Sequence, residues 1–204
     1  DRKRIRMLVM EWIDGLDRRV LLNNQRLAKL EDRVSSRRWK HINNVIITDG
    51  PKQPQFHPGC AVAIVRECLS ALEALHRSGI VHGDIKPGNI MIKRTGAAKI
   101  IDIGSAFNID EPPEQRTCTP AYAAPEVLRG EKATPLSDLA SLGYVLIELI
   151  SGRNPFAGKK TYKEMIQAKI DLPQQVDDFI PKGIGNTALL TNFCRRLIAA
   201  DPGE

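Results

Sequence analysis

The sequence of 204 residues is poor in cysteine and has no long apolar segment, and both absences narrow the class of protein. Its cysteines are Cys60, Cys68, Cys118 and Cys194, which are scattered and form no C-x-x-C pair. This pattern argues against a disulfide framework or a zinc site and favours a reducing cytoplasm as the location. The apolar runs are too short to cross a bilayer, and the charged N-terminus has no signal-peptide core.

Neither charge sign dominates, although Lys and Arg outnumber Asp and Glu by 30 to 24. Basic residues gather at positions 2–6 and 37–40, but no nucleic-acid motif accompanies them, and no nucleic acid is expected as a partner. Hydrophobic residues make up 42% and charged residues 26%, which excludes a disordered chain. The length suffices for one domain with a sizeable buried core.

Apolar residues at helical spacing predict two well-defined helices. In the first, the repeating residues are Val62, Val65, Leu69, Leu72 and Leu75, and Gly79 supplies the C-terminal stop. The second begins at Ser137 as N-cap, ends at Gly152, and is apolar around enough of its circumference to predict deep burial. Further helices are predicted over residues 161–169 and 186–199, with one or two surface helices within residues 16–40.

Short apolar runs between these helices predict a small number of strands. They cover residues 5–12, 80–81, 89–93 and 99–103, with a turn at 94–96 between the last two. Residues 49–58 and 108–119 are polar and contain prolines, so we expect loops there. The predicted fold class is therefore α+β, mainly helical, with a few short strands.

Polar side chains follow the ends of the strands predicted between residues 80 and 103. They are Asp84, Lys86, Asn89 and Asp102. Carboxylate and amide oxygens are the ligands that Mg²⁺ prefers. An ammonium can neutralise charge on a transferring phosphoryl group, and a carboxylate can accept a hydroxyl proton. The set predicts a site where metal-bound phosphate meets a nucleophile.

Five segments, in order along the chain, resemble motifs of serine/threonine protein kinases, including the bacterial kinases of the eukaryotic type. Residues 82–89 are similar to the catalytic loop (residues 80–93), and residues 102–104 are similar to the metal-binding Asp-Phe-Gly triplet. Residues 119–126 are similar to the end of the activation segment (residues 102–126). Residues 138–143 are similar to the start of the central buried helix, and residues 7–15 are similar to the strand and hinge between the two lobes. The resemblance implies the kinase C-terminal lobe over residues 16–204, with the last small-lobe strand and the hinge at residues 1–15.

The resemblance also implies a role for each matching residue. Asp84 would be the catalytic base, and Lys86 would contact the γ-phosphate. Thr119 would lie beside both residues and help to define the pocket for the residue after the acceptor. Asn89 and Asp102 would hold Mg²⁺. The implied reaction is transfer of the ATP γ-phosphate to serine or threonine hydroxyls of protein substrates.

For ATP, the resemblance implies contacts from the hinge and from the neighbouring strands. The backbone at Glu11 and Ile13 would hydrogen-bond adenine, with Met10 in the gatekeeper position. Asp17 would reach the ribose, and Met91 would pack beneath the adenine ring. The implied cofactors are therefore ATP and Mg²⁺.

The sequence departs from the kinase pattern in several places. Gly83 replaces the arginine that usually precedes the catalytic aspartate, so we expect activity to be independent of activation-loop phosphorylation. Ile103 replaces phenylalanine and is expected to remain an apolar anchor. No Gly-rich loop or strand lysine precedes Met7, so we expect a lobe truncated at both ends. We further expect this chain alone to be inactive, because phosphoryl transfer relies on both lobes.

Two other functional interpretations remain open from the sequence. A small-molecule kinase of the aminoglycoside or choline type also uses His-Gly-Asp with an asparagine five residues after the aspartate, as His82, Asp84 and Asn89 do here. Lys86 and residues 119–126 argue against it, and also against a tyrosine kinase. The second interpretation is a pseudokinase interaction module, against which the intact polar set argues. Sequence features give no expectation for the oligomeric state.

In this lobe Asp138 has two interpretations. A carboxylate in the first turn of a helix is favoured by the helix dipole alone. The kinase pattern instead makes it a buried buttress that hydrogen-bonds the backbone of the catalytic loop.

Overall fold

The structure is a computed structural model that describes residues 13–17, 22, 27, 29, 31–42, 46–48, 54–93, 95–113, 117–181 and 187–199. In this part the protein is a mainly helical α+β domain with short strands, as predicted. The strand predicted over residues 5–12 lies outside the described residues. None of the helices in the described part combines the length and apolar character that a bilayer crossing requires.

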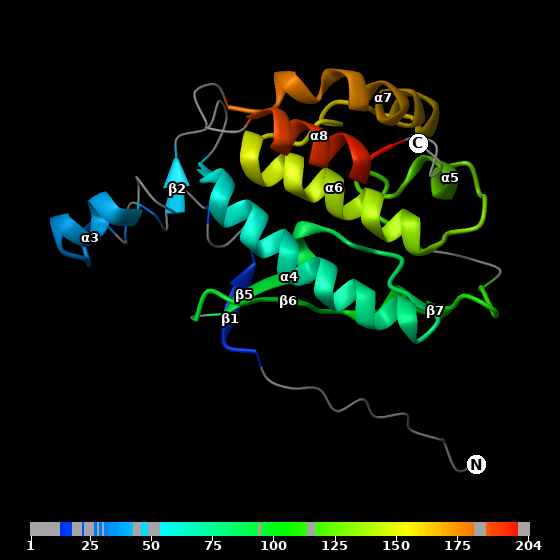
Figure 1. Ribbon diagram of the computed structural model, residues 1–204, viewed down its shortest axis with the longest axis horizontal. Helices are drawn as coiled ribbons and strands as arrows, with labels where there is room; N and C mark the ends of the chain where they lie inside the picture. The colour runs from blue at the N-terminus through cyan, green and yellow to red at the C-terminus, as the bar shows by residue number, and fades with distance from the viewer. Residues whose placement is uncertain are drawn as a thin grey trace, which may run out of the picture.

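The centre of the domain is a pair of long helices that pack against each other, α4 (Pro58–Arg77) and α6 (Pro135–Ser151) (Figure 1). Helix α4 ends before Gly79, whose φ of 72° is the left-handed conformation that a helix stop requires. Its buried residues include Ala61, Val65, Cys68 and Leu72. The predicted stripe is wrong at Val62, which is 38% exposed, because the buried face of the helix passes through Pro58 and Ala61 instead.

Helix α6 begins one turn before the predicted N-cap. Thr134 is the N-cap and Pro135 the first helical residue, while Ser137 is the third residue of a capping box with Thr134. Its residues from Ser137 to Ser151 are buried except Leu139, which is partly exposed, so this helix forms the middle of the core. It ends at Gly152, with φ 65°, as predicted.

A three-stranded antiparallel sheet lies beside α4, with strand order β1-β5-β6. The strands are β1 (Gly15–Asp17), β5 (Ile90–Lys93) and β6 (Ala98–Ile100). The sheet is joined to α4 by a hydrogen bond from the Ala98 amide to Glu67 Oε2. A strand at β1 differs from the helical expectation that began at residue 16, because its pairing with β5 determines the local conformation.

Two shorter pairs complete the strands. β4 (Ile80–Val81) pairs with β7 (Phe107–Asn108), and β2 (Ile47–Thr48) pairs with β3 (Gln55–Phe56). The second pair contradicts the loop predicted over residues 49–58, where both residues of β3 are buried. Two 3₁₀ helices, η2 (Pro87–Asn89) and η3 (Ile103–Ser105), each lie next to a strand.

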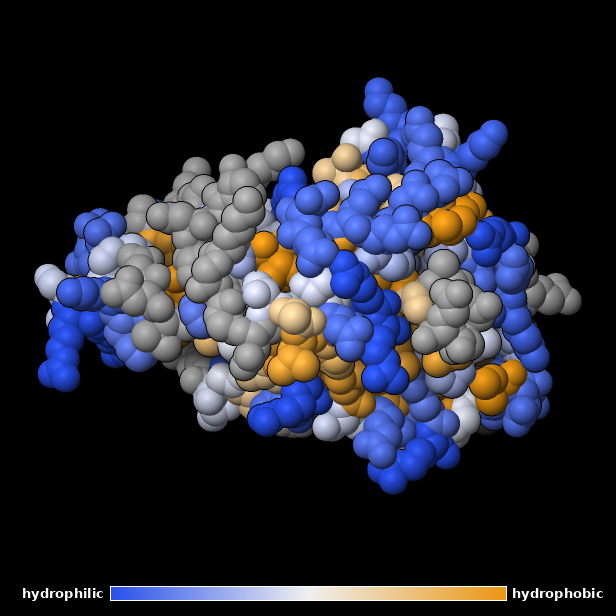
Figure 2. Space-filling view, turned by 45° about the horizontal axis from the view of Figure 1, so that its top comes forward, coloured by the Kyte–Doolittle hydropathy of each residue, from blue (hydrophilic) through white to orange (hydrophobic). Residues whose placement is uncertain are grey.

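The remaining helices cover the other side of α6 (Figure 1). They are α5 (Pro125–Leu128), α7 (Tyr162–Gln175) and α8 (Thr187–Leu197), while η4 (Val176–Asp178) follows α7 directly and α3 (Ser36–His41) belongs to the N-terminal part. Helix α7 is longer than predicted, whereas α8 agrees with its prediction within two residues at each end. Figure 2 shows hydrophilic residues over most of the visible described surface, with hydrophobic residues in separate groups between them.

Candidate active site

The catalytic loop (residues 80–93) is held by a buried carboxylate from α6. Asp138 is 1% exposed, and its two oxygens accept the backbone amides of His82, at 2.8 Å, and Gly83, at 2.9 Å. His76, in the last turn of α4, places Nε2 2.9 Å from Asp138 Oδ2. The predicted contact between Asp138 and the backbone of the loop is therefore confirmed.

Three side chains proposed from the sequence lie close together: two belong to this loop, and the third, Thr119, contacts it from a later part of the chain. Lys86 Nζ donates to Asp84 Oδ2 and, over 3.1 Å, to Thr119 Oγ1. Thr119 donates to Asp84 Oδ1 twice, from its hydroxyl at 2.7 Å and from its amide at 3.1 Å. The chain thus brings together residues 33 to 35 positions apart around one carboxylate.

These contacts decide the charge state of Asp84. Burial raises the pKa of this carboxyl, but the hydrogen bonds from Lys86 and Thr119 and the lysine charge outweigh burial, so the pKa lies below its ordinary value. Asp84 is therefore a carboxylate at neutral pH. Its side chain is 11% exposed, and a carboxylate held in this way can accept a hydrogen bond, and then a proton, from an incoming hydroxyl.

Two side chains whose oxygen atoms could bind a metal ion lie next to Asp84. Asn89 uses Nδ2 to donate to the backbone oxygen of Asp84, at 2.9 Å, and within the described residues its Oδ1 accepts no hydrogen bond. The Ile101 amide donates to the Asn89 carbonyl, at 2.9 Å, which brings Asp102 beside the loop. Asp102 is exposed, has φ 65°, and accepts the Gly104 amide at Oδ1, and within the described residues Oδ2 accepts no hydrogen bond.

The chemistry of this donor pair fits Mg²⁺. The ion prefers hard oxygen ligands and is commonly held by one or two protein groups together with phosphate oxygens. Among the described residues no group of three His, Cys, Asp or Glu side chains could hold a metal. An amide oxygen from Asn89 and a carboxylate from Asp102 are therefore the residues that could hold the ion, with the remaining ligands supplied by nucleotide and water.

The residues predicted to bind ATP are only partly described. Met10 and Glu11 lie outside the described residues. Asp17 and Met91 are Cα partners in the β1–β5 register, so they lie side by side on the sheet that leads into Asn89. Ile13 is partly buried just before β1. The roles of these residues toward ATP stay predictions.

The sequence did not indicate how the 118–124 segment is fixed to the helices beneath it. Tyr122 donates its hydroxyl to Glu148 Oε2, at 2.7 Å, and Asn154 Nδ2 donates to the same oxygen, at 2.9 Å. Glu148 lies in α6 and is 5% exposed. Its position among the apolar residues of the second half of α6 was the signal in the sequence.

Lys169 of α7 was also missed. Its side chain is 0% exposed, and Nζ donates to the carbonyl of Ala121, at 3.0 Å. The signal lay in the buried spacing of Met165, Lys169 and Leu172, but the predicted helix ended at the lysine. The 118–124 segment is thus tied to both α6 and α7.

Two departures from the kinase pattern have structural consequences. Gly83 has φ 77°, and a Cβ there would lie 2.9 Å from the carbonyl oxygen of Ser105, so an arginine would require backbone movement. The expectation that Ile103 is an apolar anchor is wrong in the described structure. Its side chain is 51% exposed, because it projects from the short η3 turn rather than from a packed strand.

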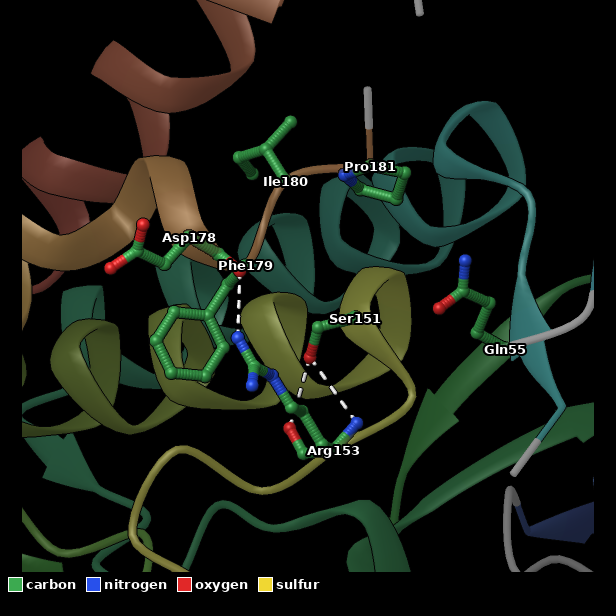
Figure 3. A pocket seen from close by; sticks show the side chains of 7 residues that line it. All are labelled: Gln55, Ser151, Arg153, Asp178, Phe179, Ile180 and Pro181. Atoms are coloured by element: carbon green, nitrogen blue, oxygen red, sulfur yellow. Dashed lines mark hydrogen bonds between the residues drawn. The ribbon is translucent and has the colours of Figure 1, made fainter. Parts of the chain in front are cut away.

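A cavity of about 380 Å³ lies far from these residues, at the other end of α6 (Figure 3). Asp138 and Ser151 are separated by about 20 Å of helix. At the cavity Arg153 donates to the Asp178 carbonyl, at 2.7 Å, and its guanidinium lies 4.3 Å from the centroid of the Phe179 ring. These contacts join the end of α6 to η4, so we assign the cavity no part in the chemistry.

Comparisons with known proteins identify the relatives of this chain. The chain is 34% identical over 147 residues to a probable serine/threonine-protein kinase of Corynebacterium efficiens, covering 69% of this chain and 22% of that protein. It is 40% identical over 122 residues to the serine/threonine-protein kinase PknB of Mycobacterium leprae, covering 57% of this chain and 19% of that protein. The PknB of Mycobacterium tuberculosis is 37% identical over 123 residues.

These matches have a defined extent. The chain spans about a fifth of the length of the curated relatives it matches. The family model for the protein kinase domain matches residues 17–204, which is most of the chain and includes the catalytic loop and both long helices. The chain therefore belongs to the protein kinase domain family.

Proposed function

We propose that this domain transfers the γ-phosphate of ATP to serine or threonine hydroxyls of protein substrates. One observation carries the proposal: in a chain of the protein kinase family, Lys86 and Thr119 bond each other and both donate hydrogen bonds to the carboxylate of Asp84. The relatives at 34–40% identity are named as serine/threonine kinases, which supports the same class of acceptor.

Asp84 acts on the acceptor hydroxyl. Because its pKa is lowered, it is ionised when substrate binds, and it orients the hydroxyl by accepting its hydrogen bond. As the hydroxyl oxygen attacks the γ-phosphorus, the bond from that phosphorus to the bridging oxygen of ATP breaks, ADP leaves, and the hydroxyl proton passes to the carboxylate. Lys86, anchored between Asp84 and Thr119, is available to neutralise charge that develops on the transferred group.

Asn89 and Asp102 hold Mg²⁺ in this proposal, through Oδ1 and the carboxylate respectively. The ion, when bound, neutralises phosphate charge and so favours transfer. The left-handed backbone at Asp102 supports a functional role, since such a conformation is uncommon outside glycine and is found at many active sites. Met10, Glu11, Ile13, Asp17 and Met91 remain the proposed contacts for ATP.

The small-molecule kinase interpretation is less well supported. It shares His82, Asp84 and Asn89, but it does not account for Lys86 or for the 118–124 segment. In this structure both contribute to the same cluster, because Thr119 and Lys86 bond each other as well as Asp84. A pseudokinase would need none of these contacts.

Regulation and location complete the proposal. Because Gly83 takes the place of the arginine that pairs with a phosphorylated loop, we propose that transfer does not depend on phosphorylation of the activation segment. The four cysteines are thiols, which supports a reducing cytoplasm as the location.

The experiment compares three forms of the full-length gene product: wild type, Asp84→Asn and the control Asp110→Asn. Asp110 is an exposed aspartate in the loop after β7. We expect ATP-dependent phosphorylation of a generic protein by wild type and by the control, and a loss of about a thousandfold in Asp84→Asn with nucleotide binding retained. Equal transfer by both variants, or none by wild type, would overturn the proposal.

A further inference from the structure

Helix α7 carries a lysine at a position where its buried neighbours are hydrophobic. Met165, Lys169 and Leu172 follow a spacing of four and three residues, and all three are buried. The Lys169 side chain is 0% exposed. Since a buried amine is far less favourable than a buried methylene chain of the same length, the lysine calls for an explanation other than packing.

The surroundings of this amine are aromatic. Nζ lies 3.7 Å from the centroid of the Phe156 ring and 4.0 Å from that of Tyr144, and the two rings meet edge to face with centroids 5.0 Å apart. Both rings are buried, so no solvent reaches the amine from that side. The rings hold the lysine stem in one direction, and they attract its positive form.

Besides the two rings, the Lys169 amine makes one polar contact within the described residues. Nζ donates to the carbonyl of Ala121, at 3.0 Å, and within the described residues it makes no other hydrogen bond. Burial lowers the pKa of Lys169 to about 6, against the opposing effects of Cys118 and Glu126, which face it. At neutral pH the group is therefore mostly a neutral amine, which keeps its ability to donate.

Ala121 has a specific place in the 118–124 segment. Two residues earlier, Thr119 bonds the carboxylate of Asp84 from its amide and its hydroxyl. The Thr119 carbonyl in turn accepts the amides of Tyr122, at 2.9 Å, and Ala123, at 3.0 Å, which closes a tight turn around Ala121. A donor that fixes the Ala121 carbonyl therefore fixes the turn that presents Thr119 to the catalytic base.

We propose that Lys169 is a positioning residue for the protein substrate: by holding the Ala121 carbonyl, it fixes the 118–124 segment in the register at which an acceptor hydroxyl reaches Asp84. This inference rests on the proposed function for what the segment positions, and on the contacts above for how it is held. Lys169 acts through the segment and touches neither ATP nor the reacting atoms.

A purely structural role gives the opposite expectation for stability. Methionine has nearly the same length and fills the same space, and it needs no partner for its end. If Lys169 only packed the core, removing it would lower the melting temperature or leave transfer unchanged. If it positions the segment, Lys169→Met keeps or raises the melting temperature, because the buried amine is gone, while substrate recognition suffers.

The test uses the full-length gene product as wild type, Lys169→Met and the matched control Lys163→Met, which removes an exposed lysine from the first turn of the same helix. We expect the KM for a peptide substrate to rise roughly three- to tenfold in Lys169→Met, as loss of one hydrogen bond implies, with the KM for ATP unchanged. The control should match wild type in every constant.

A second readout does not depend on activity. Amide hydrogen exchange at Tyr122 and Ala123 should accelerate in Lys169→Met, since their bonds to Thr119 depend on the fixed turn. If wild type transfers no phosphate, the proposed function fails and the exchange data alone decide the role of Lys169. Unchanged exchange and unchanged peptide KM, or a variant that melts at a lower temperature or does not fold, would overturn the inference.

Discussion

Two parts of the chain meet at Asp84, and each is held by a buried ionisable side chain from a different helix. The catalytic loop (residues 80–93) is held by Asp138 of α6, and the 118–124 segment by Lys169 of α7. Both side chains are almost fully buried, at 1% and 0% exposed. Both also contact backbone groups rather than the side chains that do the proposed chemistry.

They differ in how well the buried group is satisfied. The carboxylate of Asp138 accepts two backbone amides and faces the imidazole of His76, so its charge has three partners. Lys169 has one carbonyl and two aromatic rings, and burial lowers its pKa to about 6. Asp138 therefore holds the catalytic loop with a contact that stabilises the fold, whereas Lys169 holds the 118–124 segment with a contact that destabilises it.

The strongest test of this difference is Asp138→Ala. The variant leaves the amides of His82 and Gly83 without their acceptor, and a buried donor that loses its partner costs about 1–3 kcal/mol. We expect the free energy of unfolding to fall by roughly 2–6 kcal/mol, with transfer falling in parallel because the catalytic loop loses its anchor. Denaturant unfolding and initial-rate kinetics on the same samples measure both.

The control for that experiment is Asp171→Ala. Asp171 of α7 bonds only the neighbouring Gln167 side chain in the described structure, on a solvent-facing turn. Its removal should change stability by less than about 0.5 kcal/mol. If Asp138→Ala were as stable as this control, Asp138 would be a tolerated charge rather than a support, and the contrast with Lys169 would disappear.

The second test is the pH dependence of Lys169→Met. The unfolded lysine has a pKa near 10.5 and the folded one about 6, so between these values the unfolded state binds the additional proton. Wild type should therefore gain stability as pH rises, by up to about 1.4 kcal/mol per pH unit from this group, whereas the variant lacks this gain. Below pH 6 both states are protonated and the difference is constant.

The measurement is the difference in unfolding free energy between variant and wild type at pH 6, 7 and 8. Lys169→Met should exceed wild type most at pH 6, and the excess should shrink by about 2 kcal/mol at pH 8, since the folded lysine is half protonated at pH 6. Cys118 and Glu126, the two groups whose charges would act on the lysine, are common to both proteins. A difference that does not change with pH would mean that the folded lysine stays fully charged, and hence is better paired than the comparison requires.

Part of this site could be read from the sequence because its residues are local. Asp84, Lys86 and Asn89 lie within six consecutive residues of one loop. Strand β4 precedes this loop and strand β5 follows it. Asp138 followed from the kinase resemblance and was confirmed by its hydrogen bonds. Thr119 lies 35 residues from Asp84, so only the resemblance could place it beside the carboxylate.

The features that the sequence did not indicate depend on tertiary contacts. The helix predicted over residues 161–169 ended at Lys169, and a lysine there gives no sign in the sequence that two aromatic rings enclose it in the fold. The β2–β3 pair is two residues long on each strand, too short for any periodicity. The start of α6 was placed three residues late because Thr134 and Ser137 both suit a cap, and the capping box uses both.

The smallest expected effect comes from the helix caps, and it distinguishes most clearly between the roles of Asp138 and Lys169. Helices α6 and α7 begin with the same device, a threonine whose side chain accepts an amide of the first turn, at Thr134 and Thr161. Replacing either by alanine should lower the free energy of unfolding by about 1 kcal/mol. Asp138 lies four residues after Thr134, within the turn that the cap orders, whereas Lys169 lies eight residues after Thr161 and beyond it.

Thr134→Ala should therefore loosen the carboxylate that holds the catalytic loop, while Thr161→Ala should leave the lysine in place. We expect amide exchange at His82 and Gly83 to accelerate only in Thr134→Ala, with transfer slowed by no more than about fivefold, since a cap typically contributes about 1 kcal/mol to the order of that turn. Thr161→Ala, at equal loss of stability, should transfer phosphate at the wild-type rate. Equal slowing in both variants would show that transfer follows global stability, and the contacts of Asp138 and Lys169 with the two loops would then have no separate bearing on the reaction.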